Sequence, residues 1–304
     1  MSRRWKRGKC DRSVNTLRIA GLTFREAVRR KALLGAIGLT LAFLLLYGWG
    51  TGLAVRELNE ALPRGLARAG AQIGQDLTLL AIGELFLAGL YAVSNIAGLL
   101  AIFMAAGTIA QEIDQGTLHS IVSKPLARWE VVVGKWLGGA AMLAVYVAVT
   151  SLATAAIVYW RAGYLSEYLV QGVLLLVAKA TLLYSVTLVG SVLMPAITAG
   201  ITMFIVYVVT NVTGLVEQIG IAAEIESMVR IGVYGSLVLP ADAFWKMAAY
   251  TVQPPNPLPA LGINLSVGPF GVIHPPSVWM GFYGLAYMLV ALGLAVWAFS
   301  RKDL

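Results

Sequence analysis

The sequence predicts an all-α membrane protein with six transmembrane helices. Its 304 residues are 59% hydrophobic and only 12% charged, whereas a soluble domain carries about 25% charged residues. Its mean hydropathy is +0.78. Six apolar runs are separated by charged or proline-containing stretches, and each reaches the roughly 20 helical residues that cross a bilayer. These observations favour membrane helices over any soluble fold.

The six predicted spans follow the apolar runs in order. The second run is longer than a perpendicular crossing requires, so we expect that helix to be tilted or to project from the bilayer. Pro195 marks a tight turn between the fourth and fifth spans,. Gly134 and Gly138 in the third span allow close helix packing,. The spans cover residues 32–54, 77–110, 131–160, 169–192, 196–215 and 278–299.

The N-terminal region precedes the first span as a basic arm and an amphipathic helix. Residues 1–14 are basic and lack an apolar period, which indicates a disordered arm,. Residues 15–31 separate apolar and basic side chains onto two faces, which predicts an elbow helix in the membrane interface,. Simple flanking positive charge is the alternative. The apolar face carries Leu17, Gly21, Phe24 and Val28; the basic face carries Arg18, Arg25 and Arg29. We expect Arg18, Phe24, Arg25 and Arg29 to contact the interface.

The distribution of positive charge predicts that both termini are cytoplasmic. The net charge is +8, and eleven of the 23 Lys and Arg precede residue 32, which indicates an anchor on anionic lipid rather than a nucleic-acid surface,. With the N-terminus inside, sixteen Lys and Arg fall in cytoplasmic segments and six in outer segments,. Cys10 is the single cysteine, so an internal disulfide is excluded. The first apolar run lacks a clear signal cleavage site. We therefore expect a multi-pass protein of the cytoplasmic (inner) membrane.

Residues 216–277 form the longest segment between spans and lie outside in this topology. Their apolar stretches are too short to cross a bilayer. We expect an extracytoplasmic interfacial segment whose helices form an outer cap, and a re-entrant hairpin is the alternative. Asp242 is expected to cap a helix over residues 243–250,. Aromatic residues suited to an interfacial position are Tyr234, Trp245 and Tyr250,.

A patterned segment, residues 111–130, joins the second and third spans. It changes abruptly from apolar to charged, turns at a Gly-Thr pair, and continues as a short amphipathic helix that meets a proline,. An apolar stripe that faces the cytoplasm predicts a docking surface for a partner, and an ordinary interfacial loop is the alternative. The residues of this pattern are Glu112, Asp114, Gly116, Thr117, Leu118, Ile121, Val122, Pro125 and Arg128.

Together with Ser123-Lys124-Pro125 and Gly134-Lys135, this pattern resembles the signature of type-2 ABC transporter permeases. The resemblance also covers residues 23–31, 240–245 and 301–304, and so spans nearly the whole chain. It implies a single permease domain over residues 15–304, in which residues 111–130 form the coupling helix that docks on a separate ATPase subunit. Within the family, the sequence looks most similar to the permease of the transporter that serves nitrous-oxide reductase maturation.

The resemblance also implies how such a subunit works. Six spans form half of a translocation path, so two copies, or one copy and a second permease, enclose it. Two cytoplasmic ATPases would bind ATP and Mg, close, and push the coupling helices. Export is the usual direction in this family. No cofactor is expected in this chain, and the expected partners are the ATPase, a second permease and the lipid bilayer, not nucleic acid.

The sequence offers little that indicates catalysis in this chain. It lacks the G-x-x-x-x-G-K-[ST] motif that cradles phosphates,, so ATP hydrolysis is expected in a partner and this chain is not expected to be an enzyme. His119 and His274 fall on opposite sides of the predicted topology, which argues against a shared metal site within one chain. A membrane-embedded enzyme, which would need converging acid, base, nucleophile or metal ligands, is one alternative function. A scaffold that recruits a soluble partner is another.

Two ionisable residues, Glu84 and Lys179, stand out deep inside the predicted spans. At 1.5 Å per residue, Lys179 lies about 15 Å deep and Glu84 about 10 Å deep from the same side. A charge in a span is costly and by default faces a partner or a wet cavity. Because the two depths differ by about one helical turn, we expect that Glu84 and Lys179 could pair. The alternatives are exposure near the outer interface for Glu84 and a lipid-headgroup contact for Lys179.

Overall fold

The computed structural model is helical over nearly all the residues that it describes, which are 16, 18–28, 31–66, 71–114, 127–255, 270–272 and 276–302. No strand occurs among these residues. The basic arm over residues 1–14 and most of residues 111–130 lie outside the described part of the chain.

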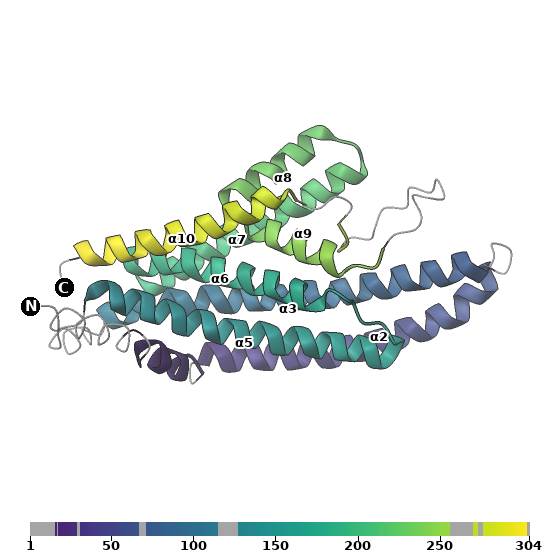
Figure 1. Ribbon diagram of the computed structural model, residues 1–304, viewed down its shortest axis with the longest axis horizontal. Coiled ribbons are helices and arrows are strands. Elements are labelled where there is room, and N and C mark those ends of the chain that lie inside the picture. Colours follow the sequence, from purple (N-terminus) through teal and green to yellow (C-terminus); the bar gives the residue numbers. More distant parts are fainter. Residues whose placement is uncertain are drawn as a thin grey trace, which may run out of the picture.

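Within the described part of the chain, six helices are long and apolar enough to cross a membrane, as predicted. Their apolar parts match the predicted spans closely, except that the fifth continues to Ile221. In Figure 1, α2 begins and α10 ends at the same end of the bundle, which we call the near end. The opposite end, where α5 ends and α6 begins, is the far end. The six helices are α2 (Lys31–Leu66), α3 (Ala71–Asp114), α5 (Arg128–Ala162), α6 (Leu169–Leu193), α7 (Ala196–Ala222) and α10 (Val278–Arg301).

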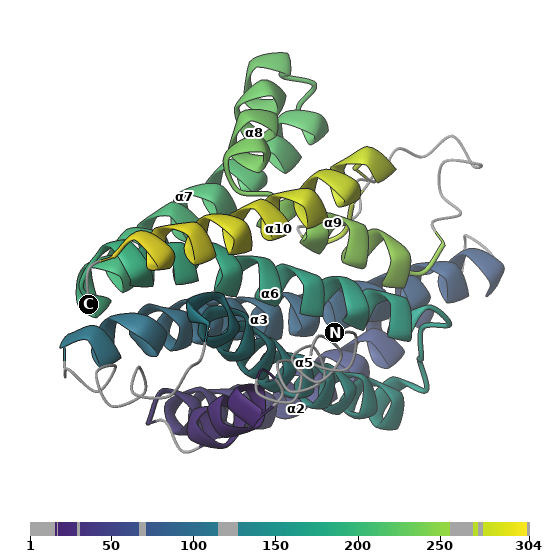
Figure 2. The same ribbon diagram turned by 60° about the vertical axis from the view of Figure 1, so that its left-hand side comes forward.

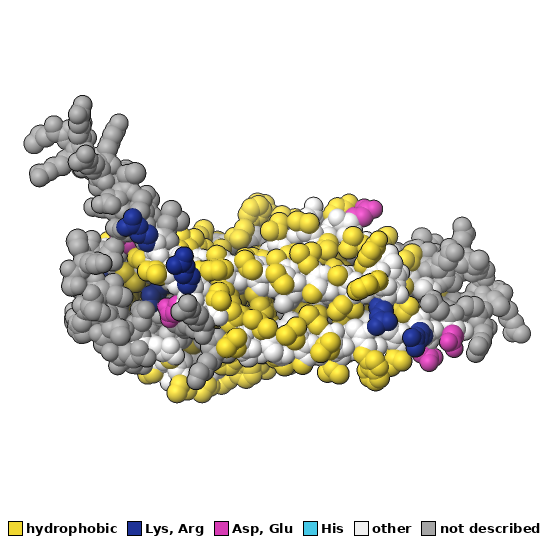
Figure 3. Space-filling view, turned by 90° about the horizontal axis from the view of Figure 1, so that it is seen from below, with side chains coloured by type: hydrophobic (Ala, Val, Ile, Leu, Met, Phe, Trp, Pro, Cys, Tyr) yellow, Lys and Arg dark blue, Asp and Glu magenta, His cyan; other side chains and the backbone are white. Residues whose placement is uncertain are grey.

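The surface of the bundle carries an apolar belt. Seen from the side of α2 and α5, hydrophobic side chains fill the middle of the molecule, while charged side chains gather toward its two ends (Figure 3). This distribution is the one that a hydrocarbon layer between two aqueous phases selects. We conclude that the chain is a polytopic membrane protein.

Helix α6 forms the centre of the bundle, where it packs against α3, α5, α7, α9 and α10. Its side chains Leu183, Tyr184 and Leu188 are fully buried. Helix α2 lies at the periphery, with Leu45 and Trp49 exposed by 76% and 68%. Such exposure is unfavourable in water, so this face is suited to lipid or to a second membrane chain.

Two shorter helices, α8 (Glu226–Val238) and α9 (Ala241–Val252), follow the fifth span. Helix α8 folds back along α7, and α9 lies between α6 and α10 (Figures 1 and 2). Gly235 lies so close to Thr213 of α7 that a Cβ atom would come within 2.0 Å of the Thr213 hydroxyl oxygen. The glycine therefore sets the close approach of α8 to α7.

The α8–α9 hairpin enters the bundle. Val252 at the end of α9 lies on Gly172 near the far end, whereas Trp245 lies near Lys179, seven residues further along α6. Helix α9 therefore packs among the spans, and the place of this segment relative to the membrane, as an outer cap or as a re-entrant hairpin, stays a prediction. Its apolar stretches are too short to span, and α9 is buried by contacts with its neighbours rather than by crossing,.

Two expectations for this segment are wrong. Asp242 does not cap a helix, because α9 begins earlier, with Pro240 at the N-cap and Asp242 in the first turn. Trp245 is only 2% exposed and belongs to the core, whereas Tyr234 and Tyr250 are exposed as expected. The aromatic pattern could not separate an interfacial side chain from a buried one, because both positions favour large amphipathic rings.

Residues 18–28 form the helix expected before the first span, and it crosses α5. Gly134 of α5 faces Ile19, and a Cβ at Gly138 would lie 2.5 Å from the carbonyl oxygen of Ala20. The two glycines therefore give the close packing that their spacing predicted. Gly21 and Val28 of the predicted apolar face are exposed, so they lie outside this contact with α5.

Candidate functional site

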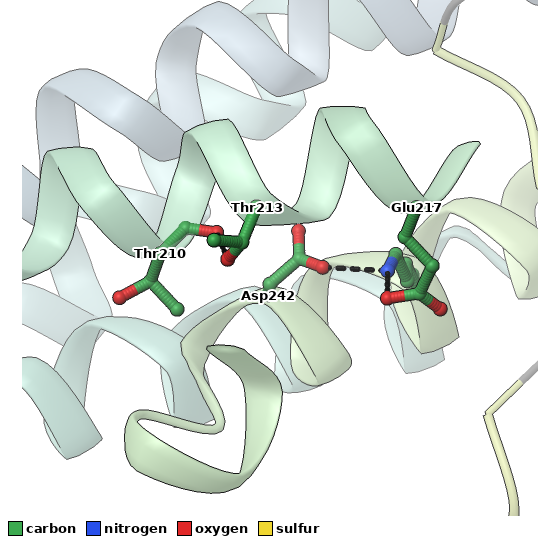
Figure 4. Close-up of polar contacts among 5 residues, drawn as sticks. Thr210, Thr213, Glu217 and Asp242 are labelled. Carbon is green, nitrogen blue, oxygen red and sulfur yellow. Dashed lines mark hydrogen bonds and ion pairs between the residues drawn. The ribbon is translucent and has the colours of Figure 1, made fainter. Parts of the chain in front are cut away.

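A buried ion-pair cluster fixes the α8–α9 hairpin to the fifth span. The Lys246 ammonium of α9 lies 2.7 Å from a carboxylate oxygen of Asp242 and 2.7 Å from one of Glu217 in α7. Figure 4 shows Asp242 and Glu217 on either side of the ammonium, with Thr210 and Thr213 along the same face of α7. The three charged side chains are at most 15% exposed.

The two carboxylates favour the charged form of Lys246. Burial lowers the pKa of Lys246, but the carboxylates of Asp242 and Glu217 raise it by more, so the pKa lies above its ordinary value,. The cluster therefore keeps a positive ammonium between two carboxylates. Asp242 also needs the absence of a side chain at Gly214, where a Cβ would lie 2.5 Å from its carboxylate oxygen.

Lys179 joins four helices at the centre of the bundle. Its ammonium donates a hydrogen bond of 2.9 Å to the Ser94 hydroxyl of α3. It also lies 5.7 Å from the ring centroid of Tyr207 in α7 and 5.9 Å from that of Trp245 in α9. These are cation–π distances. Tyr207 in turn donates to Asn95 of α3 at 2.8 Å, so the charge lies in a polar layer that crosses the bundle.

The expected contact between Lys179 and Glu84 is not made in this arrangement. Glu84 and Ser94 lie on the same helix, ten residues apart, which corresponds to about 15 Å along the axis,. The Lys179 ammonium is hydrogen-bonded at the level of Ser94, beyond the reach of a glutamate at the level of Glu84. Counting residues from the ends of two spans gave the wrong relative depth, because the apolar run of α3 has 35 residues and that of α6 has 25, so their starts do not mark the same level.

At the near end, one turn of α3 takes side-chain partners from two other helices. The amides of Ile109 and Ala110 donate to the Ser191 hydroxyl of α6, each at 3.1 Å. The Lys135 ammonium of α5 donates to the carbonyl of Thr108 at 2.8 Å. We call these three contacts the near-end clasp. This turn of α3 ends two residues before Glu112.

Arg128 ties the start of α5 to the end of α10. Its guanidinium donates to the carbonyls of Ser300 and Lys302, at 3.3 and 2.7 Å. The Lys302 ammonium donates to the carbonyl of Val192, at the end of α6, at 2.7 Å. Cationic side chains at helix C-termini satisfy carbonyls that have no partner within the helix.

The structure covers the two edges of the predicted docking segment. The backbone of Glu112 and Asp114 continues α3, and Arg128 begins α5. Arg18 and Arg25 are exposed and Phe24 is half-buried on the N-terminal helix. The other predicted site residues on these segments lie outside the described part of the chain: Arg29, Gly116, Thr117, Leu118, Ile121, Val122 and Pro125. His119 and His274 also lie outside it.

Comparison with protein families explains this architecture. Residues 18–304 match the family model described as ABC-2 family transporter protein. The chain belongs to the ABC-2 transporter family. It is therefore a membrane permease subunit of an ABC transporter, and this membership implies association with an ABC ATPase and with the membrane. No curated protein sequence matches the chain.

Sequence reasoning missed several residues that organise this permease. Asp242 and Lys246 stand four residues apart, a spacing that places them on one helical face,, so their pairing could have been expected. Glu217 and Ser94 gave no such indication, because their contacts join helices far apart in the chain. Ser191 resembles many small polar residues in membrane helices, and only the fold reveals its contact with α3.

Proposed function

We propose that the chain works as one half of an ATP-driven exporter, and that residues 111–130 dock on the ATPase. ATPase closure would push this segment toward the membrane and reorient the spans. The near-end clasp is the observation that carries the proposal. It joins α3 and α5, the two helices that flank residues 111–130, to each other and to α6.

The near-end clasp would transmit a movement of residues 111–130 to the spans, because it joins α3, α5 and α6. A displacement of residues 111–130 acts first on the ends of α3 and α5. Because Lys135 and Ser191 bind the last turns of α3, the three helices move together at the near end. Arg128 extends the same connection to α10 through Ser300 and Lys302. Four of the six spans, α3, α5, α6 and α10, are thus joined by side-chain contacts at the near end.

The proposal includes a second permease beside this one. The exposed apolar face of α2, which carries Leu45, Leu46 and Trp49, supports an interface with another membrane chain. Two identical copies or a copy with a different permease would both satisfy this requirement. ATP and Mg would bind in the ATPase partners, which carry the hydrolysis.

Loss of the apolar stripe tests the docking proposal. Leu118→Asp combined with Ile121→Asp replaces the stripe by charge, so the ATPase should no longer co-purify with the permease, while membrane insertion stays intact. Leu22→Asp is the matched control, since Leu22 is 66% exposed on the N-terminal helix and lies outside residues 111–130. Co-purification that survives the double substitution would contradict the docking site.

The alternatives make different predictions in the same experiment. A membrane scaffold would bind a soluble partner through residues 111–130, but that partner would carry no ATPase activity. A membrane-embedded enzyme would turn over a substrate without any ATPase. The finer resemblance, to the permease that serves nitrous-oxide reductase maturation, stays a prediction. Normal nitrous-oxide reductase assembly in a strain lacking this chain would contradict it.

A further inference from the structure

An apolar groove runs along the side of the molecule between the N-terminal helix, α2 and α5. Its volume is about 400 Å³, within the range of sites that hold small ligands. Phe24 and Val28 line its near end, Leu33 to Leu44 line one wall, and Met142 to Ala153 line the other. None of the described residues of the proposed docking segment lines it.

The walls of the groove are formed by apolar side-chain atoms. Three hydroxyl-bearing residues contribute to the lining, but each hydroxyl is engaged within the protein. Thr40 and Tyr146 hydrogen-bond to each other, and Thr150 donates to the carbonyl of Tyr146 at 2.8 Å. All three residues are at most 7% exposed. An apolar chain therefore fits this groove, and a polar solute would find no partner there.

The length of the groove matches one leaflet of a bilayer. Its α2 wall extends from Leu33 to Leu44, about 17 Å at 1.5 Å per residue. The hydrocarbon core of a bilayer is about 30 Å thick, so one acyl chain of the near-end leaflet spans about the same distance. The groove opens toward the lipid on the peripheral side of the bundle, where α2 is exposed.

Positive charge stands beside the near end of the groove. Arg25 is exposed on the N-terminal helix, directly after Phe24 and one turn before Val28. Arg18 is exposed two turns earlier on the same helix,. A headgroup above an acyl chain in the groove would meet these guanidinium groups, and guanidinium binds phosphate well.

We propose that this groove binds one anionic phospholipid of the near-end leaflet, with an acyl chain between α2 and α5 and its phosphate at Arg25. The lipid would fill the space between the N-terminal helix, α2 and α5. It would thereby hold the elbow against the two spans. The proposal concerns a bound lipid rather than the general lipid annulus, and it does not depend on ATPase docking or on export.

The test measures lipid binding to the purified full chain by native mass spectrometry, with phosphatidylglycerol and phosphatidylcholine of identical acyl chains. We expect one tightly retained phosphatidylglycerol per chain. Val149→Trp fills the groove from the α5 wall and should lower phosphatidylglycerol affinity by at least about tenfold, because burial of several methylene groups is lost. Val170→Trp is the matched control on α6, where Val170 is 71% exposed outside the groove.

A second pair of variants separates the headgroup from the chain. Arg25→Ala should weaken phosphatidylglycerol binding by roughly fivefold and phosphatidylcholine binding by less, because the choline ammonium already offsets the charge of the phosphate that Arg25 would meet. Arg230→Ala, at the exposed start of α8, should change neither. Inorganic phosphate should not compete with the lipid, because it cannot fill the groove.

Three outcomes would overturn the proposal. The first is equal retention of phosphatidylglycerol by Val149→Trp and Val170→Trp. The second is equal binding of both lipids by the unmodified protein, which would mean that the net charge of the headgroup is not recognised at this groove. The third is an altered oligomeric mass in Val149→Trp with lipid retention unchanged, which would make the groove a contact between protein chains.

Discussion

Lys179 places a positive charge in the centre of the bundle against one hydroxyl and two aromatic rings. We predict that Ser94→Ala destabilises the protein by about 1–3 kcal/mol, because the buried ammonium loses its hydrogen-bond acceptor. In a Lys179→Met background the same substitution should cost less than about 0.5 kcal/mol. Unfolding in detergent across the double-mutant cycle measures the coupling.

Glu84 supplies the control for this cycle. Glu84→Gln and Lys179→Met should be additive, because the ammonium lies at the level of Ser94 and not of Glu84. Coupling between residues 84 and 179, together with additivity between residues 94 and 179, would mean that Lys179 prefers the pairing that its sequence position indicated.

At this scale the sequence identified the costly residue but not its partners. A lysine among apolar residues is conspicuous because charge in a span is rare. Ser94, Tyr207 and Trp245 are ordinary residues of membrane helices, and they meet Lys179 only because α3, α7 and α9 surround α6. Which residues contact Lys179 depends on how each helix is rotated about its axis and how deep it lies relative to its neighbours. Hydropathy does not define either quantity to within one helical turn.

Among the helices, the contact of residues 18–28 with α5 depends on the absence of side chains. We predict that Gly138→Ala lowers stability by about 1–3 kcal/mol, because the new methyl group would meet the backbone of the N-terminal helix,. Gly293→Ala in α10 is the matched control, since nothing lies within 4 Å of a Cβ at that position. Thermal unfolding in detergent compares the two variants, and equal stability would show that the N-terminal helix is not held on α5.

The elements themselves differed in how well sequence predicted them. Long apolar helices were placed to within a few residues at most ends, because a span must contain about 20 apolar residues whatever packs against it,. The α8–α9 hairpin was not, because its position depends on contacts such as Gly235 with Thr213 and Val252 with Gly172. The expected helix after Asp242 exists, but Asp242 binds Lys246 instead of capping it.

In the whole molecule, side-chain contacts join four spans at the near end, and the α8–α9 hairpin packs against the spans nearer the far end. At the near end, Arg128, Lys135 and Ser191 join α3, α5, α6 and α10. Nearer the far end, Lys246 joins α9 to α7. Movement of the near end therefore reaches the hairpin through α6 and α7, both of which contact α9. This connection is what an alternating-access mechanism would require of a permease.

The orientation of the whole molecule is predicted from Lys and Arg, which favour the cytoplasmic side. Single cysteines introduced into a Cys10→Ser background test it. Ser300→Cys lies at the near end, and Glu226→Cys lies at the start of α8, where Glu226 makes only an exposed ion pair, whose loss costs little. A membrane-impermeant thiol reagent added to intact cells should label Glu226→Cys alone, and Ser300→Cys should react only after the membrane is opened. Labelling of both cysteines in intact cells would contradict six spans, and the reverse pattern would invert the topology and place residues 111–130 beyond the reach of any cytoplasmic ATPase.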